Sequence, residues 1–201
     1  MVTRRYAVPY AERMSPGADV SVREATASDV SAIAEVQVTT WRQAYGNILP
    51  RDVLDGLDPA VVEARWRESI EGKAQARAHA LIAVDDGRMV GIAAVSPATD
   101  EDEDPGTTAE LGPLLVLPAV QGKGHGSRLL AAAIDLLRAD GVSRAVCWVF
   151  QSDSGTQTFY ETAGWALDGA ARDLDAAGTL VREVRMHTDL SADPQPTLDD
   201  A

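Results

Sequence analysis

The stretch LLVLPAVQGKGHGSRLL, residues 114–130, decides the fold, because it joins an apolar run to a glycine-rich turn and an amphipathic pattern. The apolar run extends from Glu110 to Pro118 and predicts a strand buried on both faces. After the turn, apolar residues recur at helical spacing and predict a helix over 126–140: Leu129, Leu130, Ala133, Ile134 and Leu137. Gly141 is placed to end that helix.

The turn between this strand and this helix is Gln121-Gly122-Lys123-Gly124-His125-Gly126. Glycines adopt positive φ and let the backbone approach a ligand, so that successive N–H groups can point into one concave site. The positive end of the following helix and the nearby cations Lys123 and Arg128 add to the attraction for an anion. The turn therefore predicts a pyrophosphate site, although the six residues alone would also fit a plain glycine-rich turn.

Other nucleotide motifs fit this turn less well. A P-loop needs Lys followed by Ser or Thr after its last glycine, whereas His125, Gly126 and Ser127 follow Gly124. A dinucleotide fingerprint needs a third glycine where Ser127 stands and an acidic residue about 20 positions further on, where the sequence is apolar. We therefore expect neither a P-loop nucleotide site nor an NAD site.

The segments on either side of the turn predict a mixed α/β sheet with helices on its faces. Pro113 has no N–H to donate to a sheet, so we expect a bulge or a parting of strands there. Between the last two strands we expect a loop that contains Asp173, Asp175 and Gly178. Strands are expected at 20–24, 80–84, 89–95, 110–118, 144–150, 165–167 and 179–187, and helices after the capping box 26–29, from Asp58-Pro59, over 126–140 and through 159–160.

The whole chain has 201 residues, of which 45% are hydrophobic, enough for one compact domain. We expect that domain over 19–188, after an N-terminal extension of 1–18 and before an acidic flexible tail of 189–201. No apolar run approaches the roughly 18 residues of a membrane span, and no signal-peptide core follows Met1, so we expect a cytoplasmic protein that does not contact membranes. Cys147 lies in an apolar run and is expected in the core.

The formal net charge is -13, which argues against nucleic acid as a partner because phosphates require a basic surface. Part of the acidic excess lies in residues 100–104, a run that is typical of a solvated loop. An acidic surface would steer cationic amines toward the protein, but charge alone is weak support for such a substrate.

Two motifs in the chain resemble those of the GNAT superfamily of N-acetyltransferases. The turn, together with the strand before it, resembles the acetyl-CoA motif Q/R-x-x-G-x-G/A. The segment from Asp153 to Trp165, with Phe159-Tyr160 and Gly164, resembles the later motif N-x-x-A-x-x-F-Y-x-x-x-G-F. The resemblance extends over residues 20–187 and is to a bacterial-type member of the superfamily.

The resemblance implies a mixed, mostly antiparallel sheet of about seven strands, splayed at its centre, with about four helices on its faces. It implies acetyl-CoA as co-substrate and no metal. Asp153 stands where the family has an Asn beside the pantetheine, and since a carboxylate cannot donate as an amide does, capping of the short helix is its alternative role. The other implied cofactor contacts are Leu114, Leu115 and Val116 along the pantetheine arm, and Gln121, Gly122, Lys123, Gly124, His125, Gly126 and Ser127 around the pyrophosphate.

Acyl transfer to an amine needs a neutral nucleophile, stabilisation of the developing oxyanion and a proton for the departing thiolate. The sequence shows no Ser-His or Cys-His arrangement, which favours direct attack by the amine. By resemblance, Tyr160 is the general acid beside the cofactor sulfur, with core packing as its alternative role. Glu110 is the candidate base, and an exposed strand-end carboxylate is the alternative. The histidines are expected to be structural or solvent-facing: His79, His125 and His187.

The acceptor side is expected between the first two helices, where residues 40–50 resemble the wall of the acceptor pocket in bacterial relatives. Trp41 and Tyr45 would bind the acceptor there, since aromatic faces attract ammonium groups, although Trp41 could equally pack in the core. A primary amine on a small molecule is the expected acceptor. The alternatives are a protein or peptide acceptor and a non-catalytic acyl-CoA sensor, and a homodimer is compatible with the resemblance.

Overall fold

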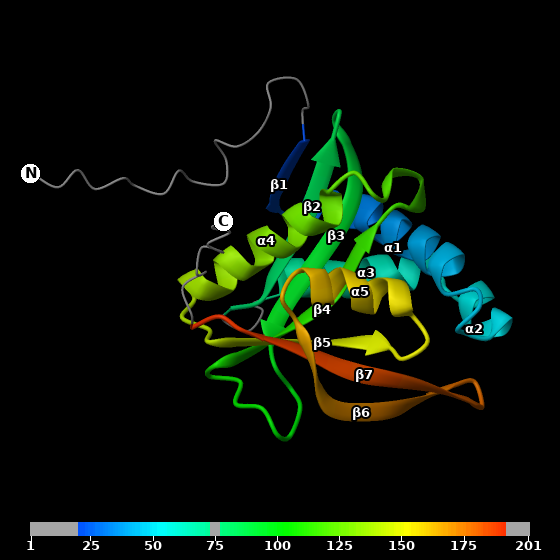
Figure 1. The fold of residues 1–201 in the computed structure, drawn as a ribbon. Helices are drawn as coiled ribbons and strands as arrows, with labels where there is room; N and C mark the ends of the chain where they lie inside the picture. The colour runs from blue at the N-terminus through cyan, green and yellow to red at the C-terminus, as the bar shows by residue number, and fades with distance from the viewer. Residues whose placement is uncertain (1–19, 73–76, 192–201) are drawn as a thin grey trace, which may run out of the picture.

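The computed structural model of the chain describes residues 20–72 and 77–191. Its strands form one seven-stranded sheet in the order β1-β2-β3-β4-β5-β7-β6 (Figure 1). The strands are β1 Val20–Glu24, β2 His79–Asp85, β3 Arg88–Pro97, β4 Thr108–Val116, β5 Arg144–Phe150, β6 Ala166–Ala176 and β7 Thr179–Asp189. The helices are α1 Val30–Ala44, α2 Arg51–Asp55, α3 Pro59–Glu71, α4 His125–Ala139 and α5 Ser154–Thr162, with short 3-10 turns at Ala27–Asp29 and Pro118–Val120.

The predicted fold class is confirmed, because the sheet is mixed and mostly antiparallel. Every neighbouring pair of strands is antiparallel except β4 and β5, which run parallel. Helix α4 packs on one face, against β2, β3 and β4, while α1 packs on the other face with α3 beside it (Figure 1). Two apolar cores result, one on each side of the sheet.

The centre of the sheet is splayed, as expected from Pro113. Strand β4 pairs with β5 only from Thr108 to Glu110, and the last pair is Glu110 with Val146. On its other side β4 pairs with β3, where the register shifts between Ala93 and Val95, so that Gly112 and Pro113 together stand opposite one residue of β3. The bulge turns β4 away from β5, and the two strands form a fork beyond Glu110.

The loop expected around Asp173 and Asp175 is wrong, because β6 continues to Ala176 and forms a long ribbon with β7. The turn is instead only two residues long, with Ala177 at φ 52 and Gly178 at φ 85, and Ala176 pairs directly with Thr179. Such a turn with two positive φ angles matches the twist of a hairpin, so the strands can pair up to it. The short helix α2 was not expected either.

The acidic run at 100–104 is not simply solvated. Arg185 of β7 is buried and forms ion pairs with Asp100, Asp102, Glu103 and Asp168. These contacts hold the loop between β3 and β4 against β7, and they raise the pKa of Arg185, chiefly through the hydrogen bond to Asp102. Part of the acidic excess is therefore structural.

The predicted N-terminal extension and acidic tail lie at the ends of the chain. The N-terminal extension, 1–18, and residues 192–201 of the expected tail lie outside the described residues. Residues 189 and 190, also assigned to the tail, instead end β7 and the core: Leu190 is buried, and its N–H donates to the Ser143 carbonyl at 2.8 Å. Within 20–72 and 77–191, no helix has the length and apolar character needed to cross a membrane.

Candidate active site

A cavity of about 610 Å³ lies at the fork, between β4, the glycine turn and α5. Its floor comes from the open edge of β4, one wall from the start of α4, and the other wall from α5. Most of the residues that the sequence predicts for cofactor binding line it. They are Leu114, Val116, Gln121, Gly122, Gly124, His125, Gly126, Ser127, Asp153 and Tyr160.

The glycine turn has the backbone geometry of an anion site. Gly122 has φ 75 and Gly124 has φ 82, so a left-handed residue stands on each side of Lys123. Gly124 is the residue before α4, whose first N–H groups face the cavity without intrahelical partners. Arg128 donates from Nη1 to the Lys123 carbonyl at 3.1 Å, and Gln121 donates from Nε2 to the Val116 carbonyl at 3.1 Å. These two side chains brace the turn from both ends.

Three of the predicted cofactor residues do not present their side chains to this cavity. Leu115 is buried in the core beneath α1 and α3, on the opposite face from Leu114, and Lys123 is exposed outside the lining. The ring of His125 is buried and lies 3.4 Å, Nε2 to Oδ2, from Asp85 at the end of β2. In this conformation Leu115 and Lys123 lie outside the cavity lining, and the His125 ring is turned into the core.

The edge of β4 that faces the fork carries unused backbone groups. Past Glu110 no described strand pairs with this edge, although β3 still pairs with the other edge up to Val116. Backbone N–H and C=O groups in a buried region need partners, so an extended ligand that pairs with residues 111–116 would satisfy them. The sheet is therefore open where a pantetheine arm would lie.

Tyr160 lies at the inner end of the cavity and is buried in the core on the α4 side. Its ring packs between Phe159, at a centroid distance of 5.2 Å, and Trp165, at 5.1 Å. Burial, and then the neighbouring Cys147 thiol, raise the pKa of Tyr160 well above its ordinary value. The phenol therefore keeps its proton at neutral pH, as a proton donor must.

Glu110 stands at the base of the fork rather than inside the cavity. Its half-buried carboxyl group has a raised pKa, because burial and the nearby charges of Asp100 and Glu183 outweigh the opposing effect of Arg172. A raised pKa makes a carboxylate a better proton acceptor, so the environment of Glu110 suits a base.

Asp153 caps α5, as the alternative interpretation held. Its carboxylate accepts hydrogen bonds from the Thr156 N–H at 3.0 Å and the Thr156 hydroxyl at 2.7 Å. Four cavity residues were not predicted as sites: Ala44, Gly155, Thr156 and Phe159. The later motif, which begins at Asp153, contains the last three, while nothing local in the sequence marks Ala44.

Tyr45 and Trp41 lie together at the end of α1. Their rings are 5.9 Å apart, and Tyr45 also packs edge-on against Phe150 of β5 at 5.0 Å. Burial raises the pKa of Tyr45 to about 12, with smaller contributions from Asp153 and Glu183. Trp41 packs against the core beneath α1, which agrees with its alternative role. Tyr45 thus lies beside the fork, on the face of the sheet opposite α4.

Comparisons with known proteins agree with this geometry. Residues 39–165 match the Acetyltransferase (GNAT) family. Over 177 residues the chain is 32% identical to the uncharacterized N-acetyltransferase YuaI of Bacillus subtilis (strain 168), which covers 86% of this chain and 95% of YuaI. The chain belongs to the GNAT family.

Solved structures share the fold of this GNAT protein. The PaiA N-acetyltransferase of Thermoplasma acidophilum, solved with coenzyme A, superimposes with a TM-score of 0.66 at 18% identity, over 85% of this chain and 99% of PaiA. The yncA protein of Salmonella typhimurium, solved with acetyl-CoA, gives 0.66 at 22% identity, over 90% of this chain and 99% of yncA. The GNAT protein is an acetyl-CoA-dependent N-acetyltransferase.

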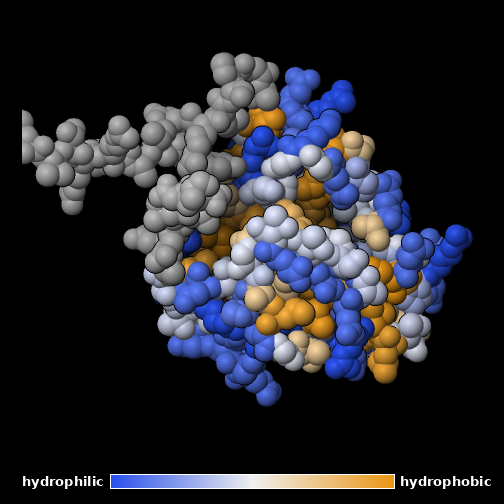
Figure 2. All heavy atoms as spheres, in the orientation of Figure 1, coloured by the Kyte–Doolittle hydropathy of each residue, from blue (hydrophilic) through white to orange (hydrophobic). Residues whose placement is uncertain are grey.

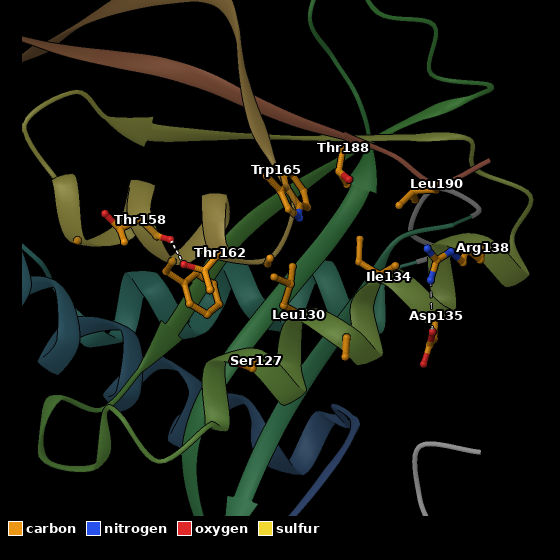
Figure 3. A pocket seen from close by; sticks show the side chains of 14 residues that line it. Ser127, Leu130, Ile134, Asp135, Arg138, Thr158, Thr162, Trp165, Thr188 and Leu190 are labelled. Atoms are coloured by element: carbon orange, nitrogen blue, oxygen red, sulfur yellow. Dashed lines mark hydrogen bonds and ion pairs between the residues drawn. The ribbon is translucent and has the colours of Figure 1, made fainter. Parts of the chain in front are cut away.

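A second hollow of about 930 Å³ adjoins the cavity, between α4 and α5 (Figure 3). It shares Ser127, Gly155 and Phe159 with the cavity, so the two border each other at these residues. Leu130 and Ile134 of α4 face Trp165 and Leu190 across it, and Figure 2 shows apolar surface on this side of the molecule framed by polar surface. Among the residues that the structure describes, no group of His, Cys, Asp or Glu could hold a metal ion.

Proposed function

We propose that the GNAT protein transfers the acetyl group of acetyl-CoA, by direct attack, to a primary amine of a small molecule. The observation that supports this most is the fork itself. A glycine turn, an open strand edge and a buried tyrosine line one cavity there, which supports binding of the pyrophosphate, the pantetheine and the thioester of acetyl-CoA in turn.

The cofactor would lie along the cavity from the turn to Tyr160. Backbone N–H groups from Gly122 to Ser127 would bind the pyrophosphate, helped by the positive end of α4. Backbone groups of residues 111–116 would pair with the pantetheine amides as another strand would. The hollow between α4 and α5 would take the nucleotide end of the molecule, where it borders the cavity at Ser127.

Glu110 and Tyr160 would divide the proton transfers between them. Glu110 accepts a proton from the ammonium group, directly or through water, so that the amine can attack the thioester carbonyl. A backbone N–H on the open edge of β4, near Val116, stabilises the negative charge that develops on the carbonyl oxygen. Tyr160 donates its proton to the departing sulfur as the C–S bond breaks, and the proton that the attacking nitrogen loses on becoming an amide passes through water to the phenolate. Because no covalent bond to the protein forms, the buried Cys147, whose pKa is raised to about 12 by burial, has no role as a nucleophile.

The acceptor would approach from the side of Tyr45, opposite the α4 face. Tyr45 and Phe150 offer aromatic surface there, which suits the ammonium group of a small amine. We also propose residues 19–188 as the acyltransferase domain. A protein or peptide acceptor is the competing substrate class.

Release of the CoA thiol, followed colorimetrically over a panel of small amines and peptides, tests the proposal. We expect acetylation of at least one small amine, identified by mass spectrometry of the product. Acetylation of peptides alone would replace the small amine by a protein acceptor. Tight acetyl-CoA binding without transfer to any amine or peptide of the panel would contradict the proposal.

A further inference from the structure

Arg172 lies on the acceptor side of the fork. Residues that pair across neighbouring strands share a face of the sheet. Glu110 pairs with Val146, Trp148 pairs with Arg185, and Glu183 pairs with both Phe150 and Arg172. We call this surface, made of Glu110, Trp148, Phe150, Arg172 and Glu183, the Trp148 face.

Arg172 is held rigidly on the Trp148 face by two contacts. Its guanidinium carbon lies 4.2 Å from the centroid of the Trp148 ring, and its Nε donates to Glu183 Oε2 at 2.6 Å. Glu183 is itself buried, whereas the Arg172 side chain remains 40% exposed. Stacking on an aromatic ring and a fixed Nε together orient the outer edge of a guanidinium without further ordering on binding.

The outer edge of Arg172 is available for a ligand. Neither Nη1 nor Nη2 of Arg172 has a hydrogen-bond partner among residues 20–72 and 77–191. The other two arginines near this face are occupied: Arg185 pairs with Asp100, Asp102 and Asp168, and Arg144 pairs with Glu103 and Asp168. A guanidinium edge with two parallel N–H groups matches a carboxylate in shape and charge.

Arg172 and the candidate base Glu110 lie on the same side of the fork. Trp148, beneath Arg172, is two residues along β5 from Val146, the partner of Glu110. Residues two apart on a strand are about 7 Å from each other, so Glu110 and the guanidinium above Trp148 lie within the span of one small molecule. The charge of Arg172 also opposes the rise in the pKa of Glu110. A molecule that places its amine at Glu110 can therefore reach Arg172 with a neighbouring anionic group.

We propose that the acceptor is an amino acid or a similar amine that carries a carboxylate, and that Arg172 binds this carboxylate through Nη1 and Nη2. The inference rests on the proposed function, because it assigns the substrate class of the same site. Glu110 supplies negative charge for the ammonium group, and Arg172, held by Glu183, supplies the positive charge for the carboxylate. Zwitterionic acceptors fit this arrangement better than polyamines, which would meet Arg172 with like charge.

Matched acceptors test this inference. Initial rates are compared for a set of amino acids and their carboxamides, which keep the amine but lack the anionic group. With the unaltered protein we expect kcat/KM to be roughly 10- to 100-fold higher for the best amino acid than for its amide, since hydrogen bonds to a charged group are worth this much. In Arg172→Gln this ratio should fall to within about threefold of unity, mainly through a higher KM for the amino acid.

Two further variants separate binding from folding. Arg172→Lys keeps the charge but not the two parallel donors, and should give an intermediate ratio. Arg182→Gln removes an exposed arginine of the same ribbon, which pairs with Asp173, and should leave the ratio unchanged. Rates are compared at a pH on the upper plateau of each profile, because loss of Arg172 also shifts the titration of Glu110.

Equal rates for amino acids and amides with the unaltered protein would overturn the inference while leaving amine acetylation intact. A ratio that survives in Arg172→Gln would also overturn it. Transfer to no amine at all, in spite of acetyl-CoA binding, would overturn the proposed function and this inference with it.

Discussion

Glu110 and Val146 form the last pair between β4 and β5, and beyond them the two strands diverge. The pair places the half-buried carboxyl group of Glu110 at the base of the fork. Its partner Val146 is followed on β5 by Cys147, whose thiol lies beside Tyr160. The candidate base on β4 and the candidate acid on α5 therefore lie near the same point of β5, on different faces of the sheet. The effects expected from replacing Glu110 or Tyr160 follow from this placement.

Replacement of Glu110 by Gln should lower kcat roughly 10²- to 10⁴-fold, the usual contribution of a general base. For the unaltered protein, kcat/KM should rise with pH as Glu110 loses its proton, at a pH above the ordinary titration of a glutamate. That limb should disappear in the variant. The exposed Glu161 of α5 provides the control, because Glu161→Gln should leave the pH profile unchanged. A profile with the same limb in Glu110→Gln would assign the base to another group.

The same substitution should make the fold more stable at neutral pH. Because burial raises the pKa of Glu110 in the folded protein, the folded state prefers the protonated carboxyl group. The contribution of Glu110 to the free energy of unfolding is therefore present at low pH and is lost as the pH rises. The glutamine side chain of the variant carries no charge, and the gain in melting temperature over the unaltered protein should grow from acidic to neutral pH. A melting temperature that falls at neutral pH would mean that the Glu110 carboxylate stabilises the fold.

Replacement of Tyr160 by Phe tests the proton donor. The ring packs between Phe159 and Trp165, and Phe keeps that packing, so the affinity for acetyl-CoA should change little. We expect kcat to fall roughly 10²- to 10⁴-fold, the usual effect of losing a general acid. Calorimetric titration with acetyl-CoA gives the affinity, and stopped-flow rates of thiol release give the chemical step. Unchanged turnover would leave Tyr160 with a packing role only.

Replacement of Gly124 by Ala should weaken acetyl-CoA binding. Gly124 has φ 82, a conformation that costs an L-residue about 1–2 kcal/mol, and an added Cβ would lie 3.3 Å from Arg128 Nη1. The turn should relax out of this conformation in the free protein, so that acetyl-CoA must restore it and its KM should rise by up to roughly 5- to 30-fold. Gly141 after α4 has φ 76 and no atom within 4 Å of an added Cβ, which makes Gly141→Ala a control with the same backbone cost. A KM that rises equally in both would remove the turn from the cofactor site.

His79 should give the protein a pH-dependent stability unrelated to the site. Although burial opposes the charged form, hydrogen bonds to Asp140 at 2.8 Å and to Glu24 at 2.7 Å raise the pKa of His79 above its ordinary value. The stabilisation is therefore full below about pH 6.5 and is lost as the pH rises through the folded-state pKa. The effect should stay below about 1 kcal/mol, since such pairs are partly solvated. Urea unfolding at a series of pH values above and below about 6.5 gives the free energy of unfolding, which should vary less with pH in His79→Gln than in the unaltered protein.

The parts of the structure that the sequence predicts well are those that local chemistry determines. The capping box at Thr26, the helix start at Pro59 and the positive-φ glycines of the turn each follow from a few neighbouring residues. Pro113 predicts the bulge in β4, because a missing donor must disturb the sheet wherever it lies.

The parts that the sequence does not predict depend on partners far along the chain. The acidic run at 100–104 has the composition of a solvated loop. In the structure, Arg185 of β7, about 80 residues further along the chain, pairs with it. Asp173 looks like a loop residue, yet it lies in β6 because β7 pairs with it. Ala44 lines the cavity only because the end of α1 reaches the fork. The proposed role of Arg172 is not predicted by the sequence either, because its partners Trp148 and Glu183 lie on other strands.

A crystal structure of the protein with CoA and an N-acetylated product tests the central claim most directly. We expect the pyrophosphate on the backbone N–H groups of residues 122–127, the pantetheine paired with residues 111–116, and the sulfur beside Tyr160. The product should lie on the opposite side of the fork, toward Glu110 and Tyr45. A pantetheine arm that runs outside the fork, or a product bound on the α4 side, would contradict it.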